Sequence, residues 1–339
     1  MGSPEFTGAT VTSLSITMTH VLCLRPEADF ARLEALPPTS LSVTYLDPSD
    51  PSLPQRMKEA RALVIPAVGA KLAPALFEGT SLKLVQVTGA GLDRLDQAAL
   101  MRLRIPVANV LGNDAVAEYA VTAATLLRRR LSWADAEIKK GNYAAFRARM
   151  LNDNLSGLEG LLVGIVGLGV IGLAVAQAFH RLGCRLCYYD PAPQNPQAAA
   201  ALGAASLSLA DLLKTADIVS LHVPLLDSTR GLIGERELAA MKADAVLIQA
   251  ARGGVVDEAA LAAQLKSGHL GGAAVDVYST EPPTADNPLL ALGESAQRLL
   301  LTPHIAGVTR QSSAFLFRSA WENVERVLVR NEPPFCRAY

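Results

Sequence analysis

Residues 161–172 read LLVGIVGLGVIG, and this stretch decides the fold. A short apolar run leads into the pattern G-x-G-x-x-G, and a helix is predicted to follow as far as Leu182. Gly167 permits a tight turn, Gly169 lets the backbone approach a pyrophosphate, and Gly172 allows the helix to pack closely on the strand. Because a helix N-terminus offers unpaired N–H groups to an anion, the stretch predicts a dinucleotide-binding βαβ unit.

The next predicted strand, residues 184–190 (CRLCYYD), ends in an acidic residue. Asp190 lies 18 residues after Gly172, close to the separation at which a carboxylate contacts the adenosine ribose in this type of fold. Such a carboxylate accepts hydrogen bonds from the ribose hydroxyls and repels a 2′-phosphate, so NAD is predicted in preference to NADP. The alternative is a purely structural glycine turn, with Asp190 as an ordinary turn residue.

Outward from this unit, strands and helices alternate in both directions. Such alternation predicts α/β architecture with a parallel sheet. Strands are predicted at residues 18–25, 61–65, 81–87, 217–224, 245–251, 272–278 and 299–302. Helices are predicted at residues 27–36, 54–60, 115–141, 208–215, 235–241, 257–267 and 309–330.

Composition narrows the class of protein. Of the 339 residues, 50% are hydrophobic and 19% are charged, and the net charge is −1. This length predicts two domains, and the apolar content excludes intrinsic disorder. The near-zero charge argues against binding of nucleic acid, and the lack of an apolar stretch of about 18 residues argues against a membrane span.

The N-terminal residues and the cysteine content indicate in which cellular compartment the protein is expected. Residues 1–10 begin with MGSPEF, which is typical of an expression-vector remnant and is expected to be disordered. It lacks the basic region and apolar core of a signal peptide. Four cysteines in a chain of this length do not form a disulfide framework. A cytoplasmic protein without a metal site is therefore expected.

Three candidate catalytic side chains follow predicted strands on the C-terminal side. Arg252, Glu281 and His304 each lie just past the carboxyl end of a different strand, where ligands bind in open α/β sheets. An arginine there can hold a carboxylate with a pair of hydrogen bonds. Hydride transfer from NADH to a 2-oxo acid leaves an alkoxide, and a histidine beside a carboxylate can supply the proton it needs. The set therefore predicts reduction of a 2-oxo acid.

Each candidate also has an ordinary structural interpretation. Arg252 could pair with Asp257 or Glu258. Glu281 could be an exposed acid before a proline turn. His222 ends a strand and is equally a candidate cofactor contact and a structural residue, whereas the three remaining histidines are interpreted as surface or capping residues.

Longer stretches resemble the D-isomer-specific 2-hydroxyacid dehydrogenase family, in the family's order and over nearly the full length. They are GAGLDRLD (89–96), NDAVAEYAV (113–121), GIVGLGVIG (164–172), HVPLLDSTRGLI (222–233), AARGGVVDE (250–258), GGAAVDVYSTEP (271–282) and TPHIAG (302–307). The resemblance implies an NAD-dependent oxidoreductase that interconverts a small 2-oxo acid and its (R)-2-hydroxy acid.

The resemblance also implies roles for individual residues. Arg252 would bind the substrate carboxylate, His304 would act as general acid and base, and Glu281 would pair with His304. Backbone N–H groups of Ala90 and Gly91 would hold the carboxylate from the other domain. Contacts to NAD are implied for Gly167, Gly169, Val170, Ile171, Gly172, Asp190, His222, Pro224, Thr229, Ala250, Arg252, Asp276, His304 and Gly307, with Asp276 facing the nicotinamide carboxamide.

The resemblance implies an α/β fold of two Rossmann-like, doubly wound domains in a discontinuous organisation. The NAD-binding Rossmann domain, residues 112–304, would be inserted into a flavodoxin-like substrate domain formed by residues 11–111 and 305–339. Family members are usually homodimers through the cofactor domain, which implies a contact for the arm near residues 115–150.

Two other functions are compatible with the resemblance. Phosphite-oxidising members place a lysine where this chain has Ala90, and formate-oxidising members place a glutamine where it has Glu281. Phosphoglycerate-oxidising members carry an arginine at the position of Val87, which argues against a phosphorylated substrate. The second alternative is an NAD(H)-sensing, corepressor-like binding protein, against which the complete set of Arg252, Glu281 and His304 argues.

Overall fold

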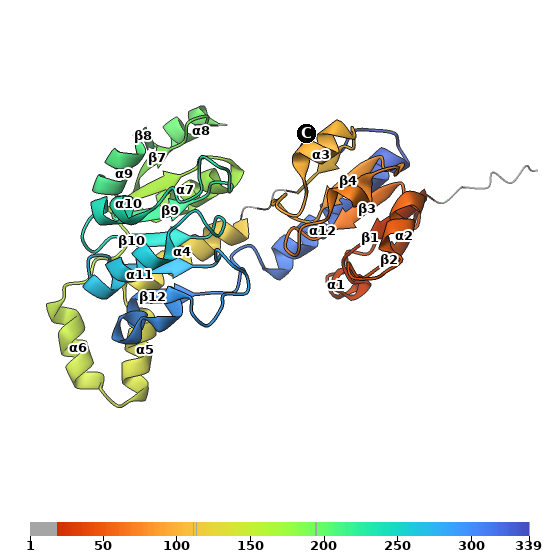
Figure 1. Ribbon diagram of the computed structural model, residues 1–339. Coiled ribbons are helices and arrows are strands. Elements are labelled where there is room, and N and C mark those ends of the chain that lie inside the picture. The colour runs from red at the N-terminus through yellow and green to blue at the C-terminus, as the bar shows by residue number, and fades with distance from the viewer. Residues whose placement is uncertain (1–18, 111, 113, 194, 339) are drawn as a thin grey trace, which may run out of the picture. The chain divides into compact units, whose positions relative to one another are not determined.

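The computed structural model describes residues 19–110, 112, 114–193 and 195–338. The predicted vector remnant at residues 1–10 lies outside these ranges. The chain divides into two compact units, and Figure 1 shows the elements of each. Unit 1 contains the residues up to Val110 and those from Phe317 onward, and unit 2 contains residues 111–316.

The second unit boundary lies further along the chain than the sequence predicts. The prediction placed it after residue 304, whereas unit 2 continues to Leu316. The backbone N–H groups of Ile305 and Ala306 each donate to the carboxylate of Asp276 at 2.8 Å, which ties this segment to unit 2. The chain then passes into unit 1 within helix α12 (Arg310–Leu328).

Unit 2 is built on a seven-stranded parallel sheet in the order β12-β11-β10-β9-β6-β7-β8. The chain starts at the central strand β6 and winds outward first to one side and then to the other, which confirms the predicted doubly wound fold. The strands are β6 (Leu162–Val166), β7 (Arg185–Tyr189), β8 (Ala205–Ser206), β9 (Ile218–Leu221), β10 (Val246–Gln249), β11 (Gly272–Val275) and β12 (Leu299–Leu301).

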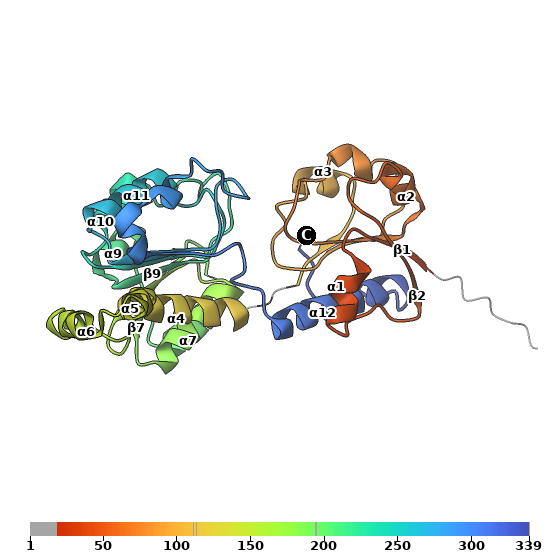
Figure 2. The same ribbon diagram turned by 90° about the horizontal axis from the view of Figure 1, so that it is seen from below.

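Helices cover both faces of this sheet (Figure 2). One face carries α4 (Asp114–Arg128) and α7 (Val170–Arg181), and the other carries α9 (Leu209–Thr215), α10 (Glu235–Ala240) and α11 (Glu258–Ser267). Sheets covered on both faces need strands that are mainly apolar, as these are, with Ser220 and Gln249 as buried polar exceptions. The short helix α8 (Pro196–Ala201) and the 3-10 helices η2 (Pro288–Ala291) and η3 (Gly293–Arg298) complete unit 2.

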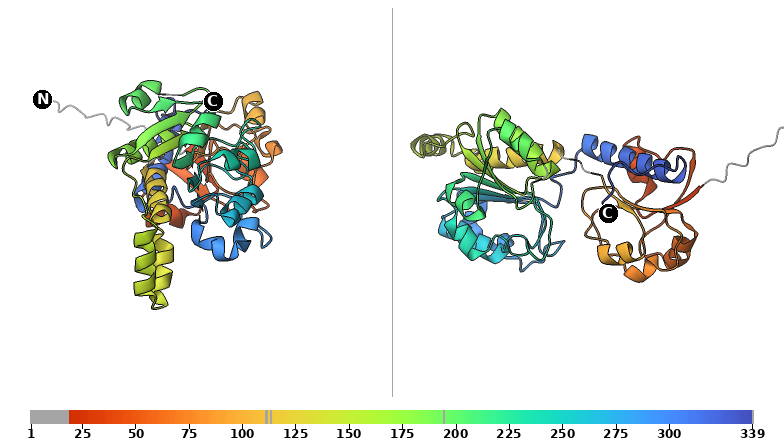
Figure 3. Two further views of the ribbon diagram at one scale, coloured as in Figure 1. Left: turned by 90° about the vertical axis from the view of Figure 1, so that its left-hand side faces the viewer. Right: turned by 90° about the horizontal axis from the view of Figure 1, so that it is seen from above.

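The predicted single helix over residues 115–141 is wrong. Helix α4 ends at Arg128 and a new helix, α5 (Leu131–Lys139), begins after Arg130, whose φ of +52° is left-handed. The guanidinium of Arg130 pairs with Asp153 and lies over the ring of Trp133, which holds the break in place. Helix α6 (Tyr143–Asn152) follows, and Figure 3 shows α5 and α6 as an arm that projects from the rest of unit 2.

Unit 1 contains a five-stranded parallel sheet in the order β2-β1-β3-β4-β5, the flavodoxin-like order that was expected. Its strands are β1 (Thr19–Cys23), β2 (Leu41–Tyr45), β3 (Ala62–Ile65), β4 (Leu84–Val87) and β5 (Val107–Ala108). Helices α2 (Leu53–Glu59) and α3 (Gln97–Arg102) lie with the 3-10 helix η1 (Pro74–Phe77) on one face, and α1 (Glu27–Arg32) and α12 lie on the other (Figure 2).

An aromatic cluster holds the C-terminal helix in unit 1. The ring of Phe30 lies 4.8 Å from that of Phe317 and 5.0 Å from that of Trp321. The buried side chains of Asn323 and Gln86 are joined by a hydrogen bond of 3.0 Å. Unit 1 is therefore assembled from both ends of the chain.

Among the described residues, no helix is long and apolar enough to cross a membrane.

Candidate active site

The glycine loop between β6 and α7 meets specific steric demands. Gly167 has a left-handed φ of +93°, and a Cβ there would lie 2.6 Å from the backbone oxygen of His222. A Cβ on Gly172 would lie 2.0 Å from the backbone oxygen of Gly167, so the helix can approach the strand only without a side chain. A Cβ on Gly169, in contrast, would meet no atom within 4 Å. The open side of the loop is therefore at Gly169, where a pyrophosphate would approach.

A cavity of about 370 Å³ lies against this open side, at the start of α7. Val170 and Ile171 form the first turn of this helix of 12 residues, whose N-terminal N–H groups favour an anion. The loop and the cavity thus fit the phosphates of a dinucleotide. The cavity is lined by Leu168, Gly169, Val170, Leu173, Ala174, Gln177 and Asn195.

Asp190 follows β7 and braces the glycine loop. One carboxylate oxygen accepts a hydrogen bond from the backbone N–H of Leu168 at 2.7 Å, and the other accepts one from Ala192 at 2.8 Å. Each carboxylate oxygen has two lone pairs, so Asp190 keeps the capacity to accept hydrogen bonds from ribose hydroxyls.

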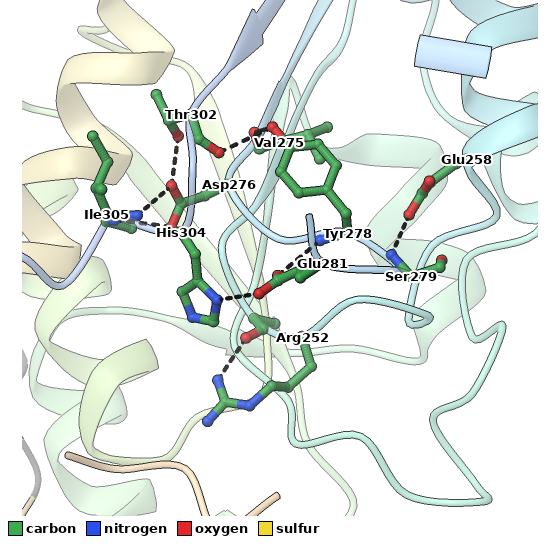
Figure 4. A network of polar contacts seen from close by, with 12 residues as sticks. Arg252, Glu258, Val275, Asp276, Tyr278, Ser279, Glu281, Thr302, His304 and Ile305 are labelled. Atoms are coloured by element: carbon green, nitrogen blue, oxygen red, sulfur yellow. Dashed lines mark hydrogen bonds and ion pairs between the residues drawn. The ribbon is translucent and has the colours of Figure 1, made fainter. Parts of the chain in front are cut away.

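Arg252, Glu281 and His304 are brought to one edge of the sheet of unit 2. They follow β10, β11 and β12, which are neighbouring parallel strands whose carboxyl ends therefore meet at the same edge. Figure 4 shows the imidazole of His304 directed toward the carboxylate of Glu281, with the side chain of Arg252 in the same region. His304 Nδ1 lies 2.9 Å from Glu281 Oε2, and both side chains are 30% exposed.

Backbone contacts fix the two members of this pair. Glu281 Oε1 accepts a hydrogen bond of 3.1 Å from the backbone N–H of Tyr278. His304 has a left-handed φ of +56°, and its backbone N–H donates to the backbone oxygen of Asp276 at 2.8 Å. Because Nδ1 is engaged by Glu281, Nε2 is the imidazole nitrogen that can exchange a proton with a bound molecule.

A buried hydrogen-bond network supports the segment that carries His304. The carboxylate of Asp276, only 1% exposed, accepts hydrogen bonds from the hydroxyl of Thr302 at 2.5 Å and from the backbone N–H groups of Ile305 and Ala306. The Thr302 hydroxyl also lies 2.8 Å from the hydroxyl of Tyr119 on α4. Since Thr302 gives its single proton to Asp276, Tyr119 must donate to Thr302. Burial raises the pKa of Tyr119 to about 12, which keeps it a donor.

The family resemblance implies a nicotinamide contact for Asp276, whereas Tyr119 and Thr302 were not predicted to be functional residues. Three hydrogen bonds to the His304 segment engage this carboxylate. The nicotinamide contact stays a prediction. Tyr119 and Thr302 both lie in stretches that carry the family resemblance, but they are 183 positions apart and neither stretch indicates a contact between them.

The backbone around Arg252 is well ordered by hydrogen bonds. Gln249 Nε2 donates to the backbone oxygen of Arg252 at 2.9 Å, and Arg252 Nη1 donates to that of Ala251 at 2.7 Å. The two acids considered as alternative partners have other roles. Asp257 caps α11 through the N–H groups of Ala259 and Ala260, and Glu258 accepts from Ser279 N and Asn287 Nδ2.

The arrangement of a glycine loop, a braced acid and a histidine–glutamate pair agrees with the comparison with known proteins. Residues 121–306 match the family model "D-isomer specific 2-hydroxyacid dehydrogenase, NAD binding domain". The chain belongs to the D-isomer specific 2-hydroxyacid dehydrogenase family. It is thus an NAD-dependent oxidoreductase.

Named relatives cover most of this dehydrogenase. It is 39% identical to (S)-sulfolactate dehydrogenase of Chromohalobacter salexigens over 73% of this chain and 78% of the relative, and 33% identical to glyoxylate reductase of Aeropyrum pernix over 86% of each. The crystal structure of apo D-mandelate dehydrogenase from Rhodotorula graminis has a TM-score of 0.79 at 28% identity, covering 95% of this chain and 97% of the other. The chain spans only 42% and 50% of two D-3-phosphoglycerate dehydrogenases it matches.

The other residues predicted to contact NAD in this dehydrogenase lie in loops at the carboxyl edge of the sheet. His222 Nε2 lies 2.8 Å from Ser220 Oγ, its Nδ1 is buried, and burial lowers the pKa of its imidazole to about 4, so it is neutral at pH 7. Thr229 Oγ1 donates to the backbone oxygen of Pro224 at 2.6 Å and orders that loop. Ala250 directly follows β10, and Gly307 follows the His304 segment.

Ala90 and Gly91 lie in unit 1, in the loop after β4. The backbone oxygen of Ala90 accepts a hydrogen bond of 2.8 Å from Asn109 Nδ2, which fixes the loop. Within the described ranges, the N–H groups of Ala90 and Gly91 have no acceptor. They are therefore open to an anion.

Proposed function

We propose that this dehydrogenase interconverts a small 2-oxo acid and its (R)-2-hydroxy acid. The observation that carries the proposal is the hydrogen-bonded pair of His304 and Glu281, with 2.9 Å between Nδ1 and Oε2, at the ends of neighbouring strands. Glyoxylate reductase and D-mandelate dehydrogenase, two of the similar proteins, are named for acids of this class.

The proposed residues divide the work between cofactor and substrate. The glycine loop, with Gly169 at its open side, and the first turn of α7 would hold the pyrophosphate, and Asp190 would take the adenosine ribose. Bound NADH supplies a hydride to C2 of the 2-oxo acid, and NAD⁺ accepts it in the reverse direction. Arg252 would form charge-assisted hydrogen bonds with the substrate carboxylate. The N–H groups of Ala90 and Gly91 are the carboxylate donors that we propose for unit 1.

Proton transfer falls to His304. As the carbonyl carbon is reduced, its oxygen takes up negative charge and accepts the proton from Nε2. In the reverse direction, Nε2 removes the hydroxyl proton. Glu281 holds the Nδ1–H, so the imidazole keeps the tautomer and orientation that both directions require.

A substrate survey tests the proposal. Consumption of NADH is measured with glyoxylate, pyruvate, hydroxypyruvate and bulkier 2-oxo acids, and reduction of NAD⁺ with formate and phosphite serves as the comparison. We expect turnover with at least one 2-oxo acid and no turnover with formate or phosphite. Oxidation of formate or phosphite without turnover of any 2-oxo acid would replace it by the first alternative.

Replacing Asp190 by alanine is expected to shift the choice of cofactor. The variant loses an acceptor for the ribose hydroxyls and a repulsive charge against a 2′-phosphate. We expect NADH affinity to fall about tenfold, with a smaller loss or a gain for NADPH. Both dissociation constants are measured by fluorescence titration, with the exposed Asp135→Ala as control. An unchanged NADH-to-NADPH ratio would contradict the ribose contact, because loss of the Leu168 hydrogen bond alone weakens both cofactors alike.

Tyr119→Phe tests the buried network. The variant removes the Tyr119 hydroxyl. The Thr302 hydroxyl still donates to Asp276 but no longer accepts a hydrogen bond from Tyr119. We expect kcat to fall about 3- to 10-fold, the scale of one net hydrogen bond, with a smaller change in KM. Ser49→Ala, which removes an exposed hydroxyl from the loop after β2, is the control. If kcat of the two variants is the same, the network does not position His304.

We further propose that the arm formed by α5 and α6 makes the contact of a homodimer. Helix α5 has no buried residue, and the arm exposes large apolar side chains for which a second copy of the chain would provide cover. These are Leu131, Ile138, Tyr143 and Leu151.

A further inference from the structure

The carboxyl edge of the sheet in unit 1 contains a second place where a ligand is expected. Its strand order β2-β1-β3-β4-β5 reverses direction between the neighbouring strands β1 and β3. Ligands of open α/β sheets bind at such a reversal, outside the carboxyl ends of the strands. The loops that follow β1 and β3 therefore frame a candidate site within unit 1.

Arg94 occupies this place. Its side chain donates from Nε to the backbone oxygen of Ala70 at 2.9 Å and from Nη1 to that of Pro66 at 3.3 Å, both in the loop after β3. A Cβ on Gly69 would lie 3.3 Å from its guanidinium carbon, so the loop wraps closely around the group. The residue is 4% exposed.

The positive charge of Arg94 is not balanced by an acid. Within the described ranges, no carboxylate pairs with it, and its Nη2 donates no hydrogen bond. Burial lowers the pKa of the Arg94 guanidinium, and the positive charge of Arg25 lowers it further. A buried cation with no anionic partner is unfavourable, and a bound anion would remove that penalty.

Arg25 adds a second guanidinium from the loop after β1. Its Nη1 is paired with Asp29 at 2.7 Å, and its guanidinium lies 4.8 Å from the ring centre of Phe317, which holds it in place. Its Nε is buried without a hydrogen-bond partner. Asp29 also contacts the exposed Arg32 at 3.3 Å, so these four side chains together carry two surplus positive charges, and that of Arg94 is the buried one.

The loops that hold Arg94 also contain the open N–H groups of Ala90 and Gly91. A Cβ on Gly89 would lie 2.8 Å from Ala67 Cβ, so the loops after β3 and β4 touch. The backbone N–H of Leu72 donates to the backbone oxygen of Arg94 at 2.8 Å, which is a second contact between these two loops. One pair of loops in unit 1 thus carries two open amides and an unbalanced guanidinium.

We propose that Arg94, assisted by Arg25, forms an anion subsite in unit 1 that binds a second anionic group of the substrate. The inference rests on the proposed function, in which the N–H groups of Ala90 and Gly91 in unit 1 hold the first carboxylate of the 2-oxo acid. The preferred substrate is then a 2-oxo acid with a carboxylate, sulfonate or phosphonate on the carbon chain beyond the carbonyl. The planar fork of an arginine suits each of these groups.

A matched series of substrates tests the subsite. 2-Oxobutanoate, oxaloacetate, 3-sulfopyruvate and phosphonopyruvate share the frame X–CH₂–CO–COO⁻, in which X is methyl, carboxylate, sulfonate or phosphonate. We expect the wild-type enzyme to show kcat/KM about 10- to 100-fold higher for one of the anionic members than for 2-oxobutanoate. The member with the highest value identifies the group that the subsite binds.

Variants of the arginines separate binding from loop support. In Arg94→Gln the ratio between the anionic member and 2-oxobutanoate is expected to fall to about one, and in Arg94→Lys to an intermediate value. Arg102→Gln, on the exposed side of α3, is expected to keep the wild-type ratio. If Arg94→Gln does not fold, Arg25→Gln provides the measurement, with an expected fall in the ratio of about 3- to 10-fold.

Two results would overturn the subsite while leaving the proposed function intact. One is a wild-type ratio near one, and the other is an Arg94→Gln variant that lowers kcat/KM equally for all members, as a purely loop-supporting residue would. Failure to reduce any member or any other 2-oxo acid, in an enzyme that binds NADH, contradicts the proposed function and the subsite with it.

Discussion

Replacing His304 by alanine is expected to lower kcat by about 10²–10⁴-fold, the usual scale for loss of a general acid or base. The imidazole is the group that Glu281 orients at the carboxyl edge of the sheet, through the 2.9 Å contact between Nδ1 and Oε2. Without Nε2, the developing alkoxide must take its proton from water. Steady-state rates with saturating NADH and 2-oxo acid measure the effect.

The matched control is His180→Ala, which removes an exposed imidazole from α7 and should leave kcat unchanged. NADH binding by the His304→Ala variant is followed by fluorescence, so that a displaced loop is distinguished from a missing proton donor. A kcat within about threefold of the wild-type value would refute the proposed role of His304.

Arg252→Ala is expected to raise KM for the 2-oxo acid about 10²–10³-fold. A bidentate, charge-assisted pair with the substrate carboxylate is worth roughly two hydrogen bonds to a charged group, and alanine removes both. Arg252→Lys retains the charge without the planar fork and should fall between the wild-type enzyme and the alanine variant.

The exposed Arg236→Ala is the control for this substitution, since its side chain is 92% exposed. KM and kcat are measured at saturating NADH for the best substrate of the survey. A fall in kcat with KM unchanged would show that Arg252 acts on the transition state and does not anchor the carboxylate.

The sequence predicts most of the NAD-binding unit because its chemistry is local. The glycine spacing of residues 167–172 has steric causes that the structure shows, at the left-handed Gly167 and the close packing of Gly172. Likewise, an arginine, a glutamate and a histidine that each follow a parallel strand must lie at one edge of the sheet. Their contact distances, in contrast, depend on the loops and follow only from the structure.

Features that depend on tertiary packing could not be predicted from the sequence. The left-handed Arg130 interrupts a stretch that is helical by composition, because Asp153 and Trp133 engage its guanidinium from elsewhere in the arm. Strand β2 was not predicted. Only Leu41 in it is buried and the other four residues are partly exposed, so its apolar pattern is weak. The contacts that tie residues 305 and 306 to unit 2 come from Asp276, which lies about 30 positions away in the chain.

Arg94 illustrates the same limit for function. In the sequence it is one charged residue in the family-like stretch GLDRLD, with nothing to distinguish it from a solvent-exposed arginine. Its near-complete burial, its backbone partners and its lack of an acidic partner in the described ranges come from the fold.

The central claim is that this enzyme reduces C2 of a 2-oxo acid and gives the D isomer. The most direct test supplies NADH deuterated at the transferable position of nicotinamide C4, together with the best 2-oxo acid of the survey, and analyses the product by mass spectrometry and chiral chromatography. We expect one deuterium at C2 of a single D-2-hydroxy acid. Product without deuterium at C2, or the L isomer, would contradict it.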